Sequence, residues 1–222
     1  MTPSDLVAVA ADLKPKLRGW LHAGAIPAAV ICGVVLVALS PAELRLATAI
    51  YALSAVALFS ISTTLHRGHW QPRTSSVLRR IDHATIFVLI AGSYTPIAAA
   101  LLGSEASTLL AFVWGGAVLG ALFRIFWVDA PRWLTAPVYV AMGWTAIFYV
   151  PEFWRSGGAA VVILIGVGGL MYSVGALVYA LRLPNPSPRW FGFHEVFHSL
   201  TLGGYVTHYI AISLAVYGVA RA

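Results

Sequence analysis

The stretch FGFHEVFHSL, residues 191–200, contains two histidines that are four residues apart and a glutamate between them. H-E-x-x-H is the pattern in which zinc proteases bind metal through both histidines and activate water with the glutamate. Side chains four residues apart share one face of a helix, so His194 and His198 can bind the same ion. The pattern leaves three explanations open: a protease helix, another kind of metal site, or two histidines that cap a buried helix.

Two other groups of polar residues can join these histidines. Ser62 and His66 are four residues apart near the end of one apolar run, and Asp82 opens another. Three neutral imidazoles and one open position describe a catalytic zinc site, whereas structural sites usually close with four protein ligands. The sequence therefore offers His66, His194 and His198 as metal ligands. Asp82 is then a fourth ligand or the partner of a water on the metal, and Ser62 can orient that water or a substrate.

The elements that must position these residues are membrane helices. Of the 222 residues, 59% are hydrophobic and 10% are charged, whereas soluble domains carry roughly 25% charged residues. The first strongly apolar run starts near Gly24, so no cleavable signal peptide is evident. The single cysteine, Cys32, excludes an intramolecular disulfide. The net charge of +6 needs no nucleic-acid partner, because basic loops commonly flank membrane spans.

Hydropathy predicts an all-α integral membrane protein built as a seven-transmembrane helix bundle. A helix needs about 20 mostly apolar residues to cross the hydrocarbon. We expect one domain, 1–222, that begins with a short cytoplasmic N-terminal segment, 1–21. The separators, among them RSGG at 155–158, are short, so neighbouring helices should be antiparallel. The expected spans are 24–40, 44–65, 82–102, 107–127, 134–150, 159–181 and 190–218.

The basic residues predict an orientation. With seven spans, one side of the membrane receives eleven of the fourteen Lys and Arg residues, and the other receives Arg45, Arg155 and Arg221. Basic loops stay in the cytoplasm, so we expect a cytoplasmic N-terminus and a C-terminus outside. This orientation gathers the polar groups described above at the cytoplasmic ends of their helices. Histidines that snorkel to lipid headgroups are the alternative explanation, and we expect His83 to be such a loop or interface residue.

The protease explanation lacks a third ligand. No Asp or Glu follows Glu195, and His208 lies ten residues after His198, which is roughly 15 Å along a continuous helix. Glu195 also points about 100° around the helix from the adjacent histidine. We therefore expect Glu195 to face the neighbouring loop or to pair with Arg80 or Arg189, and we expect His208 to need a polar partner within the span.

Three blocks of the sequence resemble a known family. SISTTLH (60–66), DHATIFVLIAGSYTP (82–96) and HEVFHSLTLGGYVTHY (194–209) are similar to the signature blocks of the haemolysin III family. That family is the bacterial branch of the progestin and adipoQ receptors, within a wider group that includes alkaline ceramidases. The resemblance implies seven helices, a cytoplasmic N-terminus and a zinc ion near the cytoplasmic leaflet of a bacterial inner membrane.

The resemblance also implies roles for individual residues. Zinc would be held by three histidines, with an aspartate that contacts it through water and a serine beside it. Carried over position by position, these are His66, His194 and His198, with Asp82 and Ser62. The first block of the receptors, which has acidic residues and an asparagine ahead of a histidine, is reduced here to His22 in RGWLHAG (18–24).

Two functions of different classes fit these expectations. The first is a zinc-dependent hydrolase of lipid amides or esters, in which Asp82 accepts a proton, Ser62 places the carbonyl, and a long-chain lipid arrives from within the bilayer. The second is a non-enzymatic membrane protein, either a sensor or a cytolytic protein, in which zinc only ties helices together. The sequence leaves the oligomeric state open.

Overall fold

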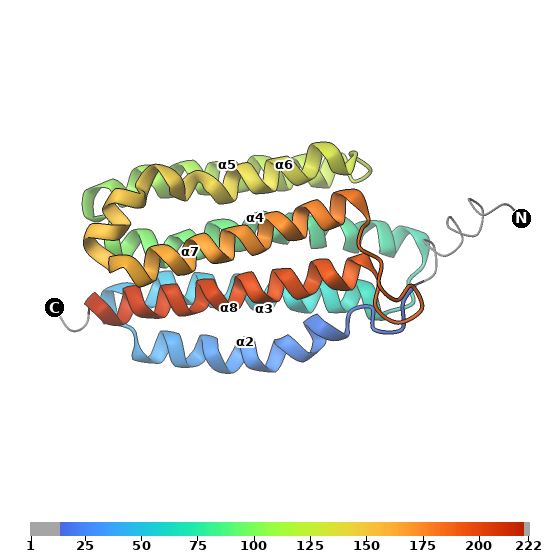
Figure 1. The fold of residues 1–222 in the computed structure, drawn as a ribbon, viewed down its shortest axis with the longest axis horizontal. Helices are drawn as coiled ribbons and strands as arrows, with labels where there is room; N and C mark the ends of the chain where they lie inside the picture. Colours follow the sequence, from blue (N-terminus) through green and yellow to red (C-terminus); the bar gives the residue numbers. More distant parts are fainter. Residues whose placement is uncertain (1–13, 220–222) are drawn as a thin grey trace, which may run out of the picture.

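Long helices run side by side along the longest axis of the molecule (Figure 1). The computed structural model describes residues 14–219. Residues 1–13 of the predicted N-terminal segment lie outside the described residues, as does Arg221. Within the described part, the bounds of the α-helices are α2 Trp20–Leu39, α3 Arg45–Arg67, α4 Pro72–Leu101, α5 Ala106–Phe126, α6 Arg132–Gly143, α7 Val150–Leu181 and α8 Phe193–Val219.

Six helical stretches in the described residues are long and apolar enough to cross a membrane. The prediction of an all-helical membrane protein is therefore confirmed. Short 3-10 turns, Ala42–Leu44 and Gly103–Glu105, extend α3 and α5 at their starts. The membrane-length stretches are Trp20–Leu39, Ala42–Arg67, Pro72–Leu101, Gly103–Phe126, Arg132–Leu181 and Phe193–Val219.

The stretch Arg132–Leu181 has 50 residues and is not one straight rod. Gly158, at its middle, has a non-helical backbone with φ 78° and ψ 175°, and the ribbon reverses direction between α6 and α7 in Figure 1. Two hydrogen bonds link its halves. Arg132 Nη1 donates to Tyr179 O at 3.3 Å, and Trp144 Nε1 donates to Ser173 Oγ at 2.9 Å. In a straight helix the first pair would lie roughly 70 Å apart, so α6 and α7 form an antiparallel hairpin.

Helix α4 begins earlier than the hydropathy predicted. The expected span started at Asp82, but the helix starts at Pro72, which occupies its first turn. Proline suits this position because an N–H group there would have no acceptor within the helix, so its absence costs nothing, and the φ of proline is already helical. Six of the eight residues 73–80 are Arg, Ser or Thr, which hides this extension from a hydropathy window. Asp82 and His83 are consequently inside α4 rather than at its end, so His83 is not a loop residue.

Close packing of α3 against α4 keeps the ends of the two helices together. A Cβ atom added at Gly92 of α4 would lie 2.4 Å from Oγ and 3.0 Å from Cβ of Ser54 in α3. The Ser54 hydroxyl could rotate away, but its Cβ is fixed to the α3 backbone, so the absence of a side chain at Gly92 favours this close approach. The C-terminal end of α3 and the N-terminal ends of α4 and α8 lie at the same end of the bundle (Figure 1), where the predicted site residues meet.

Candidate metal centre

Three histidines from two helices form a cluster at this end of the bundle. His66 comes from the last turn of α3, and His194 and His198 come from the first two turns of α8. One ring nitrogen from each can be chosen so that all lie within 4.8 Å of one another. The Nε2 atoms of His66 and His194 are 3.1 Å apart. Within the described residues, this cluster can hold a metal ion.

A fourth histidine fixes the orientation of the most buried one. His22, in the first turn of α2, is 2% exposed, and its Nε2 lies 2.7 Å from Nδ1 of His198. The remaining nitrogen of His198, Nε2, is buried and has no hydrogen-bond partner among residues 14–219. If Nδ1 donates to His22, Nε2 presents a lone pair to the cluster. This is the arrangement in which a second residue sets the tautomer of a metal-binding histidine.

The donor set fits zinc. Imidazole nitrogens bind Zn²⁺ at about 2.0–2.1 Å in tetrahedral geometry, which places two nitrogens on the same ion roughly 3.3 Å apart. The separation of 3.1 Å between the His66 and His194 nitrogens is close to that value. The unpartnered Nε2 of His198 supplies a third nitrogen. Three imidazoles leave one position of a tetrahedron open.

The other two predicted site residues differ in their surroundings. Asp82 is half-buried and lines the same cavity as the three histidines, but it is not a member of the group whose ligand atoms all lie within 4.8 Å. Ser62 is 2% exposed, and its hydroxyl has no hydrogen-bond partner among the described residues. It is not among the residues that line the cavity. The structure therefore brings Asp82, rather than Ser62, to the cavity wall.

Glu195 makes structural contacts at this end of the bundle. Its Oε1 accepts from Nε of Arg18 at 2.5 Å, and its Oε2 accepts from the backbone N–H of Gly192 at 2.8 Å. In the second contact, a glutamate in the first turn of α8 caps the backbone N–H just before that helix begins. The expectation of a contact with the neighbouring loop is thus met, but the ionic partner is Arg18 and neither Arg80 nor Arg189. With 1% exposure and this ion pair, Glu195 is a structural residue.

A second polar cluster lies beside Asp82. The guanidinium of Arg124 in α5 is 4% exposed, and its Nη2 contacts Nδ1 of His83 at 2.6 Å. The same guanidinium donates to Trp127 O and Val128 O, which follow the end of α5. The hydroxyl of Tyr139 in α6 donates to His83 O at 3.2 Å. These contacts tie α4, α5 and α6 together at the cavity wall.

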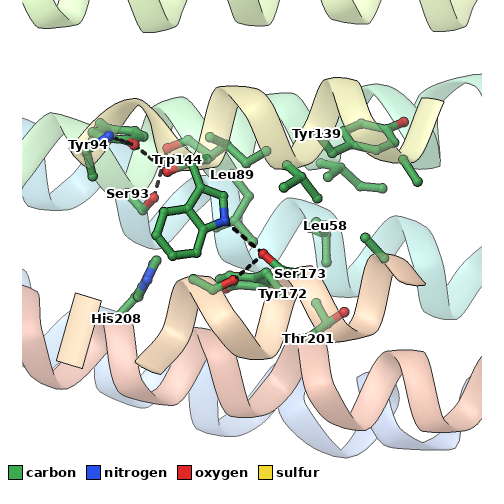
Figure 2. A pocket seen from close by; sticks show the side chains of 18 of the residues that line it. Leu58, Leu89, Ser93, Tyr94, Tyr139, Trp144, Tyr172, Ser173, Thr201 and His208 are labelled. Atoms are coloured by element: carbon green, nitrogen blue, oxygen red, sulfur yellow. Dashed lines mark hydrogen bonds between the residues drawn. The ribbon is translucent and has the colours of Figure 1, made fainter. Parts of the chain in front are cut away.

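One apolar cavity of about 250 Å³ extends from the histidines into the bundle. Its wall includes the three histidines and Asp82 at one end, and it continues between α4, α6, α7 and α8 to His208. Figure 2 shows the indole of Trp144 reaching across this space to Ser173, with Leu58 to one side and His208 to the other. Ligand pockets of this kind are mostly apolar, with a few polar groups that fix orientation.

Comparison with known proteins decides the family. The sequence profile described as haemolysin-III related matches residues 11–209. The chain belongs to the haemolysin-III related family. Among its relatives, the Hemolysin-3 homolog of Bacillus subtilis (strain 168) is 38% identical over 157 residues, which cover 70% of each chain. Hemolysin-3 of Bacillus cereus is 33% identical over 157 residues, covering 70% of this chain and 68% of the relative.

A plant protein is also similar to this chain. The protein named Heptahelical transmembrane protein ADIPOR2 in Oryza sativa subsp. japonica is 29% identical over 184 residues, covering 74% of this chain and 80% of that relative. The expected family is therefore confirmed. For this haemolysin-III chain, the sequence analysis named His22 without assigning it to the centre, and it gave Arg18 no role there. The sequence did contain a signal for His22, because it lies at the predicted cytoplasmic end of the first span, at the same depth as the other three histidines.

Replacing His22 by phenylalanine should weaken metal binding without removing a ligand. The variant keeps an aromatic ring of similar size but loses the nitrogen that faces Nδ1 of His198. We expect about 10- to 100-fold lower affinity for zinc, the usual cost of losing such a partner. Competition with a chromophoric chelator measures this affinity. His69, an exposed histidine between α3 and α4, provides the control His69→Phe; equal affinities in both variants would refute the orienting role.

Proposed function

We propose that this protein is a zinc-dependent hydrolase of long-chain lipid amides or esters in the bacterial inner membrane. The observation that carries the proposal is the shared wall of the cavity. Three clustered histidines and Asp82 stand at one end of an apolar space that continues into the bundle. A carbonyl at the histidines and an alkyl chain in the apolar part would fit one elongated lipid.

The residues divide the chemistry between them. Bound here, zinc supplies a nucleophile at neutral pH, because it lowers the pKa of a coordinated water to about 7. His66, His194 and His198 hold the ion, and His22 keeps the lone pair of His198 turned toward it. The Asp82 carboxylate accepts the proton from the attacking water. Ser62 does not line the cavity, so its proposed role is to position Asp82, beside which its buried hydroxyl lies.

The cavity favours an enzyme or lipid-binding protein over a channel. A pore needs a polar lining along its length, whereas Leu58, Leu89, Ile97 and Phe153 are among the residues that line this space. Two relatives carry the name hemolysin, which makes cytolysis the alternative activity. A purely structural ion would give no reason for Asp82 to face the same cavity as the histidines. The hydrolase accounts for both features.

Hydrolysis can be measured with purified protein in lipid nanodiscs. Supplied with an N-acyl sphingoid amide and an acyl ester, the zinc-loaded protein should release fatty acid detectable by mass spectrometry. Asp82→Asn should lower the rate about 100-fold or more, because a general base contributes about 10²–10⁴. His194→Ala should abolish it, and His69→Ala should leave it unchanged. If neither substrate class yields metal-dependent release of fatty acid, the hydrolase proposal fails.

We also propose seven membrane crossings with a cytoplasmic N-terminus and an external C-terminus. The hairpin at Gly158 supports two crossings by the stretch Arg132–Leu181, in addition to one crossing by each of the other five stretches. The excess of basic residues on one side supports the orientation. The histidine cluster then lies at the cytoplasmic leaflet.

The single native cysteine makes this topology easy to test. In a Cys32→Ser background, one variant carries Ser156→Cys beside the Gly158 turn, and another carries Pro186→Cys in the loop before α8. Both native positions are exposed. A membrane-impermeant maleimide applied to spheroplasts should label the cysteine at position 156 and spare the one at 186 until the membrane is permeabilised. Labelling of both in intact spheroplasts would contradict seven crossings.

A further inference from the structure

His208 stands at the deep end of the cavity, remote from the histidine cluster. It belongs to α8 and lines the same cavity as His194 and His198. Its Nε2 lies 3.2 Å from the backbone oxygen of Ile165 in α7. A carbonyl oxygen only accepts hydrogen bonds, so Nε2 must carry the proton. The polar partner expected for this residue is therefore the α7 backbone.

This contact determines what the other ring nitrogen can do. In a neutral imidazole with the proton on Nε2, Nδ1 is an acceptor. Nδ1 of His208 makes no hydrogen bond to any of residues 14–219, and it is not among their enclosed, unpartnered polar atoms. Because the side chain lines the cavity, this acceptor is available to a molecule inside it.

The position of the ring is built into the packing of α7. A Cβ atom added at Gly168 would lie 2.3 Å from Cδ2 and 2.5 Å from Nε2 of His208. The missing side chain at Gly168 therefore makes the space that the imidazole occupies. On another side the ring packs edge-on against Tyr172, with 5.3 Å between ring centroids. The imidazole is thus held in a prepared position.

The neighbouring polar groups mostly satisfy one another. Trp144 Nε1 donates to Ser173 Oγ, which itself donates to Gly169 O. The hydroxyl of Tyr94 donates to Gly143 O and accepts from Ala146 N. No hydrogen bond within the described residues uses the hydroxyl of Tyr172, another residue of the cavity wall.

The two polar groups without hydrogen-bond partners among the described residues, on His208 and Tyr172, indicate which chemical groups a ligand should carry. His208 Nδ1 needs a donor, and the Tyr172 hydroxyl can donate or accept. A ligand hydroxyl can donate to Nδ1, whereas a ketone, an ester or an ionised carboxylate has no hydrogen to give to it.

The distance between His208 and the histidine cluster determines how far along a lipid chain the hydroxyl must lie. His208 follows His198 by ten residues of the continuous helix α8, which is about 15 Å along its axis. An extended chain advances roughly 1.2 Å per bond, so about twelve bonds cover this distance.

We propose that the His208 end of the cavity binds a hydroxyl group carried on the chain of a lipid whose polar head lies at the histidine cluster. The preferred ligand class is a hydroxylated long-chain lipid. This rests on the proposed function, since it takes the lipid of that proposal as the occupant. The contact with His208 adds a second polar interaction, which distinguishes hydroxylated chains from unsubstituted ones.

Binding of free fatty acids tests the inference without any turnover. ω-Hydroxydodecanoic acid and dodecanoic acid are each titrated into zinc-loaded protein in detergent, in competition with a fluorescent fatty acid. The native protein should bind the hydroxylated acid about five- to tenfold more tightly after correction for partitioning into micelles, the usual worth of one buried neutral hydrogen bond. His208→Phe should remove this preference and leave the affinity for dodecanoic acid unchanged.

Two glycine variants guard against a folding artefact. Gly168→Ala displaces the ring of His208 without changing it, and should also reduce the preference. Gly115→Ala makes the same change where a Cβ meets nothing within 4 Å, and should keep the preference. Equal binding of the two acids to the native protein, or equal weakening of both by His208→Phe, would overturn the inference. A protein that hydrolyses nothing but still shows this preference would refute the proposed function and leave the inference standing.

Discussion

Imidazole nitrogens buried at the end of a membrane bundle need partners, because the hydrocarbon offers none. His22, His66, His194 and His198 bring eight such nitrogens into one small region. Nδ1 of His198 contacts Nε2 of His22, whereas Nε2 of His198 and Nδ1 of His22 are buried without partners among residues 14–219. The Nε2 atoms of His66 and His194 are 3.1 Å apart, close to the separation of two nitrogens on one zinc ion. One cation can satisfy a lone pair from each of His66, His194 and His198 together, so this cluster can hold a metal ion. Such an ion would join the end of α3 to the start of α8, and His22 ties α2 to the same place through its contact with His198.

The same constraint changes the meaning of the H-E-x-x-H pattern. Its two histidines point into a cluster whose third member comes from α3, 128 residues upstream. Its glutamate turns the other way, where it pairs with Arg18 and holds the first turn of α8. A buried ion pair is stable only when its remaining polar atoms are also hydrogen-bonded, and here the Gly192 N–H supplies that hydrogen bond to Glu195. The pattern is therefore shared with metalloproteases, while the glutamate has a structural task here.

Much of this arrangement could be predicted from the sequence, and the reasons are specific. Apolar length identified the helices, loop charges placed His66 and His194 in one layer, and the four-residue spacing put His198 on the face of His194. Hydropathy could not show that α4 begins at Pro72, because its first turns are polar, and for that reason His83 was misplaced. The partners of Glu195 and His198 are 177 and 176 residues away in the chain. Only tertiary packing brings them together.

The central claim is that three histidines bind one metal ion, and metal analysis tests it most directly. The protein would be purified without added metal and analysed by inductively coupled plasma mass spectrometry beside His66→Ala and His194→Ala, with circular dichroism showing that all three are equally helical. The account predicts about one zinc ion per chain in the native protein, as for a three-histidine site, and almost none in either variant. Native protein that contains no metal, or variants that retain as much as the native protein, would contradict it.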